Sequence, residues 1–176
     1  MEQRPPHPIA AALLSDGPAR DDQQELLLFG RFIGSWDLDV CWFDGGRVVR
    51  RERGEWHFGW ILGGRAIQDV WIVPPRSDNV PDTDVYECGT SIRFYDPRLN
   101  AWRSTWHGPV QGSVRPFTAN LQGTEIVLEG QELGGASIRW IFSDIESDRF
   151  AWRFETKLER SHSWATVQSF DCVRRA

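Results

Sequence analysis

Residues 55–73 read EWHFGWILGGRAIQDVWIV, and this stretch decides the fold. Two runs rich in Trp, Phe, Ile and Val flank a central Gly-Gly pair, a pattern typical of a β-hairpin with a two-residue turn. Pairing across such a turn sets Phe58 opposite Asp69 and His57 opposite Val70. Because successive side chains of a strand point to opposite faces, this register separates His57 from Asp69. A one-residue bulge in the first strand would bring the two together.

Short apolar runs separated by turn signals continue from this hairpin toward both ends of the chain. The turn signals are clusters of Gly, Asp and Pro, such as Asp44-Gly45-Gly46, Asp96-Pro97 and Gly134-Gly135. They delimit ten predicted strands: 36–43, 47–61, 65–73, 89–95, 101–107, 113–120, 124–131, 136–142, 149–157 and 163–174. Most connections have hairpin length, which favours a meander closed into a barrel over a Greek-key sandwich. The predicted fold class is therefore all-β, a single antiparallel up-and-down β-barrel of about ten strands.

Two segments fall outside the strand pattern. Residues 1–20 contain four prolines and are predicted to form a flexible arm, which leaves 21–176 as the barrel domain. Residues 74–88 contain three prolines and four acidic residues. They are predicted to form a long loop that is either a lid or a disordered excursion, and the sequence leaves both interpretations open.

A short helix is predicted just before the first strand. Asp22 followed by Glu25 resembles a capping box, and residues 26–33 carry a broad apolar face. Gly34 is the residue expected to end the helix. We expect this helix to close one end of the barrel.

The composition excludes several classes of function. A net charge of −5, with one tight basic cluster at 47–53 that also contains Glu52, argues against a nucleic-acid partner. The three cysteines and four histidines lack the spacing of metal ligands, so no metal site is predicted. No apolar run approaches the roughly 18 residues of a membrane span, which argues against a membrane partner. We expect a cytoplasmic protein with reduced cysteines and no cofactor.

The strands carry two contrasting faces. In most of them, one face is mostly aromatic and the other carries Arg, Tyr, His and carboxylates. In one orientation the aromatic face forms the core and the polar face is exposed to solvent. In the other, the polar face lines a cavity, and the aromatic rings are covered by the helix or by a second subunit. The sequence leaves both orientations open.

The order of several short motifs adds a family resemblance. Gly34-Ser35-Trp36 resembles the opening Gly-x-Trp of calycin-type barrels, the superfamily of lipocalins and fatty-acid-binding proteins. Residues 61–65, Phe94-Tyr95-Asp96 and residues 102–106 follow in an order similar to that of DUF1579 proteins, a bacterial family of uncharacterised function. The resemblance covers about residues 30–173. It implies a lipocalin-like barrel and supplies no established reaction.

A related branch, the nitrobindin-type barrels, binds haem and opens with a longer Gly-x-Trp-x-Gly-x-Gly pattern. This chain reads GSWDLD over residues 34–39, without the later glycines. His162, near the last hairpin, is a lone loop histidine of the kind usually found at the surface. We therefore expect no haem.

Three functions fit such a barrel. The first is binding of a small, partly apolar molecule with a polar or anionic end in a barrel cavity. The second is an acid/base lyase, isomerase or cyclase acting on a small molecule on the same barrel. The third is a homodimeric interaction domain that uses exposed tryptophans and has no interior ligand.

The candidate site residues come from the polar face and from the rings beside it. The predicted catalytic residues are His57, Asp69, Tyr95 and His107, whose side chains can exchange or orient protons. Arginine and carboxylate groups would bind the polar end of a ligand, and Trp would supply contact area. The predicted ligand-binding residues are Glu55, Arg65, Arg93, Arg103, Trp106, Arg139, Trp152, Arg153 and Glu155.

Overall fold

The hairpin expected around the Gly-Gly pair joins two neighbouring strands of the barrel. The computed structural model describes residues 7–20, 23–81, 85–159 and 162–175. In it, β3 (Arg47–Ile61) pairs with β4 (Ala66–Val73), with Phe58 opposite Asp69 and His57 opposite Val70. The predicted register is confirmed. This pairing has no bulge, so His57 and Asp69 lie on opposite faces of the sheet.

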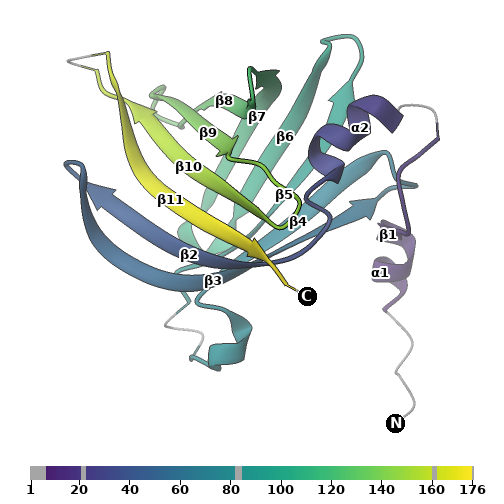
Figure 1. The fold of residues 1–176 in the computed structure, drawn as a ribbon, viewed down its shortest axis with the longest axis horizontal. Coiled ribbons are helices and arrows are strands. Elements are labelled where there is room, and N and C mark those ends of the chain that lie inside the picture. Colours follow the sequence, from purple (N-terminus) through teal and green to yellow (C-terminus); the bar gives the residue numbers. More distant parts are fainter. Residues whose placement is uncertain (1–6, 21–22, 82–84, 160–161, 176) are drawn as a thin grey trace.

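Ten antiparallel strands close into the barrel shown in Figure 1, which confirms the predicted fold class. Each strand pairs with its neighbour in sequence, β2 pairs with β11, and the β3–β4 pairing completes the order. The remaining strands are β2 (Gly34–Asp44), β5 (Glu87–Asp96), β6 (Ala101–Gly108), β7 (Ser113–Gln122), β8 (Glu125–Gln131), β9 (Ser137–Ser143), β10 (Arg149–Lys157) and β11 (Trp164–Arg174).

The aromatic face lines the interior, and the polar face points outward. Five rings near the barrel centre, those of Trp56, Trp71, Trp140, Trp152 and Phe170, are almost completely buried. They touch one another, with centroids 4.4 Å apart for the stacked Trp152–Phe170 pair and 5.2 Å apart for Trp71–Trp140. Such rings fill the centre at the density of a protein core. Each of the ten tryptophans is buried or half-buried, so the exposed tryptophans required by the interaction-domain hypothesis are not found.

The helix α2 (Gln23–Gly30) lies over one end of the barrel (Figure 1). Phe29 and Phe32 insert into the core there, and the indole nitrogen of Trp36 donates a hydrogen bond to the Phe32 carbonyl oxygen at 2.7 Å. The helix ends at Gly30 rather than at Gly34. A Cβ atom at position 30 would lie 2.8 Å from the Trp60 ring, so the chain needs glycine at this contact. Asp22 of the expected capping box lies outside the described residues.

The segments before and between these elements pack on the outside of the barrel. A short helix, α1 (Pro8–Leu13), leads into β1 (Leu14–Ser15), which pairs with the end of β3. The predicted boundary between arm and barrel at residue 20 stays a prediction. Within 74–88, the 3-10 helix η1 (Arg76–Asp78) is the one regular turn among the described residues before β5 begins at Glu87. Another 3-10 helix, η3 (Pro109–Gln111), links β6 to β7.

Across the described part of the chain, no helix has both the length and the apolar character needed to cross a bilayer.

One ion pair lies inside the aromatic core. Asp69 and Arg93 come from the neighbouring strands β4 and β5, both are fully buried, and the guanidinium binds the carboxylate directly. The guanidinium carbon lies 4.9 Å from the ring centroid of Phe29, and the rings of Phe58 and Phe142 are also within cation–π range. A charge in this position is tolerated because its partner and these ring faces replace water.

We predict that Asp69→Ala lowers the free energy of unfolding by about 3–5 kcal/mol, because it leaves Arg93 buried without a counter-ion. Urea unfolding followed by tryptophan fluorescence measures the loss. The matched control is Glu125→Ala, which removes one of the two carboxylate partners of Arg153 from a half-exposed pair at 3.0 Å and should cost under about 1 kcal/mol. Equal losses in the two variants would contradict the role given to the buried pair.

Candidate functional site

The predicted site residues divide between the two faces of the barrel wall. Asp69, Arg93, Trp106 and Trp152 are buried in the interior. Tyr95 is half-buried near α2, where its hydroxyl donates to the Asn100 side chain at 2.8 Å. The other predicted residues lie on the outer face or at a turn: Glu55, His57, Arg65, Arg103, His107, Arg139, Arg153 and Glu155. The fold therefore does not gather the predicted set into one site.

The outer arginines bind protein carboxylates. Arg139 of β9 and Arg153 of β10 both donate to Glu155 of β10. Arg153 also donates to Glu125. Arg103 donates to Asp96 at 2.9 Å. These guanidiniums are thus engaged in ion pairs on the barrel wall and not in the ligand-binding role predicted for them from the sequence.

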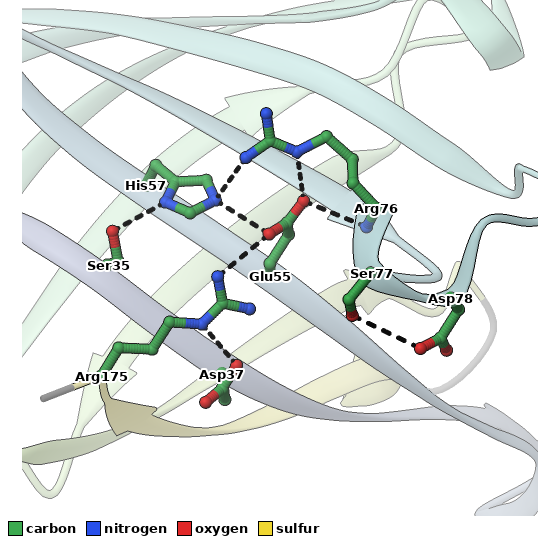
Figure 2. Close-up of polar contacts among 8 residues, drawn as sticks. All are labelled: Ser35, Asp37, Glu55, His57, Arg76, Ser77, Asp78 and Arg175. Carbon is green, nitrogen blue, oxygen red and sulfur yellow. Dashed lines mark hydrogen bonds and ion pairs between the residues drawn. The ribbon is translucent and has the colours of Figure 1, made fainter. Parts of the chain in front are cut away.

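Glu55 forms the centre of a larger polar cluster on the outer face (Figure 2). Its side chain is almost completely buried although it points away from the barrel interior. Arg76 donates to it through both its backbone nitrogen and its side chain, and Arg175 donates from the other side at 3.1 Å. His57 Nε2 lies 3.1 Å from the same carboxylate, and His57 Nδ1 lies 2.9 Å from the hydroxyl of Ser35.

The order hydroxyl, imidazole, carboxylate resembles a catalytic relay, but the contacts at His57 favour a structural role. In a relay, the imidazole donates to the carboxylate and accepts from the hydroxyl. Here the carboxylate already accepts from the guanidiniums of Arg76 and Arg175, and Nε2 of His57 also lies 3.2 Å from a guanidinium nitrogen of Arg76. The cluster instead joins three distant parts of the chain: strand β3, the η1 turn and the C-terminal end of β11.

The electrostatics of Glu55 follow from these contacts. Burial alone would raise the pKa of this carboxyl group, but hydrogen bonds from Arg76, His57 and Arg175 outweigh burial and lower the pKa to about 2. Glu55 is therefore a fixed anion at neutral pH, suited to hold the surrounding cations and not to transfer protons.

A second polar group of residues lies inside the barrel at the end opposite α2, which we call the mouth. Glu87 begins β5, Arg115 lies near the start of β7, Gln168 is in β11, and Gln111 reaches in from η3. Together with the rings below them they enclose a cavity of about 40 Å³. Its wall consists of Trp71, Glu87, Cys88, Trp106, Gly108, Val110, Gln111, Arg115, Trp140, Phe154 and Gln168.

Two glycines allow the Trp106 ring to form part of this wall. A Cβ atom at Gly89, on the neighbouring strand, would lie 2.2 Å from the ring, and one at Gly108 would lie 2.7 Å from its nitrogen. The ring therefore packs directly against the backbone of β5. It contacts Trp71, with ring centroids 4.2 Å apart, and Trp140, at 5.8 Å. The result is a rigid aromatic floor under the mouth.

Glu87 is the buried carboxyl group of the mouth, with 8% of its surface exposed. Its oxygens accept from Gln168 at 3.1 Å and more weakly from Gln111 at 3.5 Å. Burial raises the pKa of Glu87, while the two amides and the more distant Arg115 oppose the rise. A carboxyl group held by neutral amides beside an aromatic floor is a typical arrangement for binding a ligand's polar end.

The sequence analysis did not select Glu87, Gln111, Arg115 or Gln168. Glu87 fell within the segment predicted as a loop, and Gln111 follows a strand end. Gln168 carried a usable signal, because it shares the inward face of its strand with Phe170 and Cys172. A polar residue on an otherwise apolar face is the kind of exception that indicates a site.

Comparison with solved structures finds two barrels similar to this one. The S-type phycobiliprotein lyase CPES from Guillardia theta superimposes with a TM-score of 0.56 at 12% identity, over 90% of this chain and 99% of that one. Rv2717c from M. tuberculosis gives a TM-score of 0.57 at 13% identity, over 86% and 97%. What they share is the fold.

At these identities the likeness carries no information on function. The likeness extends to the barrel architecture alone. A scan against protein-family models and a search of curated proteins both find no match. The resemblance to DUF1579 therefore stays a prediction.

We predict that Glu55→Gln destabilises the protein by about 2 kcal/mol at pH 7, a value reduced from the full pKa shift because Arg76 is largely solvent-exposed. The pKa of Glu55 is lower in the folded state than its usual 4.5. Its contribution is therefore complete above that value and is lost as the pH falls toward 2. Urea unfolding of both proteins at several pH values measures this.

The matched control is Glu52→Gln, in the same strand, whose half-exposed pair with Arg50 is worth about 0.5 kcal/mol or less. A difference between wild type and Glu55→Gln that persists unchanged at pH 2 would contradict the electrostatic account.

Proposed function

We propose that this protein binds a small, partly apolar molecule at the barrel mouth, with the molecule's polar end against Glu87 and its apolar part against Trp106. The observation that carries the proposal is the buried Glu87 carboxyl group, held by two amides at the wall of an aromatic-lined cavity. Burying such a group costs free energy that a core residue would not incur, so its retention there favours a binding role.

The position of the ligand differs from the deep cavity expected from the sequence. Large rings fill the barrel centre, and the cavity at the mouth is small, about 40 Å³. The ligand's polar end enters this cavity and its body lies outside, along the rim. Tyr86 and Trp42 supply aromatic surface at the rim, with the Arg50 guanidinium stacked on Tyr86.

We expect the neutral dye N-phenyl-1-naphthylamine, which fluoresces in apolar sites, to bind saturably to the wild-type protein. Trp106→Phe should weaken its binding about fivefold, because the ring that forms the cavity wall loses contact area. The matched control is Trp102→Phe in the same strand, since Trp102 is equally buried but packs on Phe29 near α2.

Thermal unfolding of each variant shows that it is folded during the titration. The proposal is overturned if the wild type gives no saturable signal, or if Trp106→Phe and Trp102→Phe weaken binding equally.

A further inference from the structure

The charges at the mouth leave one carboxylate without an ionic partner. Arg50 pairs with Glu52 at 3.1 Å, and Arg115 pairs with Glu132 at 2.8 Å. Within the described ranges, Glu87 has amide partners and no ion pair. When it is ionised, it is therefore the charge of the cavity without a direct counter-ion. A ligand that supplies a positive charge gains most there, because a buried carboxylate is stabilised by a direct counter-ion.

The hydrogen-bond directions at the cavity also favour a donor on the ligand. Gln168 and Gln111 both turn their NH₂ groups toward Glu87, which leaves their carbonyl oxygens as acceptors. Arg115, the cation of the cavity wall, is held by Glu132 and by the hydroxyl of Ser113. The wall thus offers a carboxylate to a ligand, which suits a group carrying N–H donors.

The aromatic floor suits a cation as well. A cation is attracted to the faces of Trp rings, most strongly where water is excluded. Trp71, Trp106 and Trp140 form the floor, and Phe154 adds a fourth ring to the wall. The indole nitrogens of Trp71 and Trp140 are inaccessible to solvent, so these rings do not present their N–H donors to the cavity.

The size of the cavity limits the kind of cation. A cavity of about 40 Å³ has room for a small head group such as an ammonium group. A trimethylammonium group needs several times that volume. The cation is therefore a primary amine, with its carbon chain leading outward to the rim.

We infer that the ligand of the mouth is a protonated primary amine on an apolar or aromatic body. Its ammonium group pairs with Glu87 and lies over the Trp71–Trp106–Trp140 floor. This inference rests on the proposed function, and it replaces the anionic end considered from the sequence with a cationic one. A carboxylate ligand is the opposite case, which would use Arg115 and would be repelled by an ionised Glu87.

The test compares three probes with the same phenylethyl body: 2-phenylethylamine, 3-phenylpropionate and trimethyl(2-phenylethyl)ammonium. Isothermal titration calorimetry at pH 7.5 gives each affinity, and displacement of N-phenyl-1-naphthylamine shows whether the mouth is the site. We expect the primary amine to bind at least about tenfold more tightly than the other two probes. Equal or tighter binding of 3-phenylpropionate would overturn the inference.

Two variants assign the effect to the carboxylate. Glu87→Gln keeps the shape of the side chain and should weaken the amine about tenfold while changing dye binding less than about twofold. Glu125→Gln, an acid at the opposite end of the barrel, is the matched control and should leave amine binding unchanged. If Glu87→Gln leaves amine affinity unchanged, the inference is wrong.

The two proposals fail separately. If the dye binds in a Trp106-dependent manner but the amine neither binds nor displaces it, the proposed function stands and the amine inference falls. If neither the dye nor any of the three phenylethyl probes binds saturably, both fall.

Discussion

The close packing of large rings at the barrel centre is the constraint on which the rest of the structure depends. About eight strands already enclose an interior that side chains only just fill, and a ten-stranded barrel is wider. Here the additional volume is taken by indole and phenyl rings such as Trp56, Trp71, Trp140 and Trp152, each nearly inaccessible to solvent. Because these rings occupy the centre, space for a ligand is left only toward the ends of the barrel.

The two ends are built differently, and the difference determines where chemistry is available. At one end, Phe29 of α2 and Phe32 just after it continue the aromatic core, and the charged side chain of Arg93 is enclosed between their layer and the Asp69 carboxylate. At the mouth the core ends at the Trp106 floor, and polar side chains begin immediately above it. At the closed end each charge has a direct counter-ion, whereas Glu87 at the mouth is held only by neutral amides.

Local patterns predict the fold better than the site. The turn signals predicted strand ends within two residues, and the Gly63-Gly64 turn fixed the register of β3 on β4, because both features are local. Alternation sorts side chains into two faces but does not say which face is inside, and the sequence analysis left that open. The cluster at Glu55 could not be predicted, because its partners Arg76 and Arg175 lie 21 and 120 residues away in sequence.

The outer cluster and the mouth are physically connected through one segment of chain. Arg76 is held to Glu55 on the outer wall, and the next regular element among the described residues is β5, which begins with Glu87. Tyr86 donates its backbone N–H to the Val73 carbonyl at 2.9 Å, so the end of this segment is fixed to β4 as well. The contacts at the two ends of the segment restrict where the Glu87 side chain can lie. A carboxylate that recognises a ligand must be held in place before binding. The polar outer face therefore contributes to the mouth by positioning it, even where its own residues never meet a ligand.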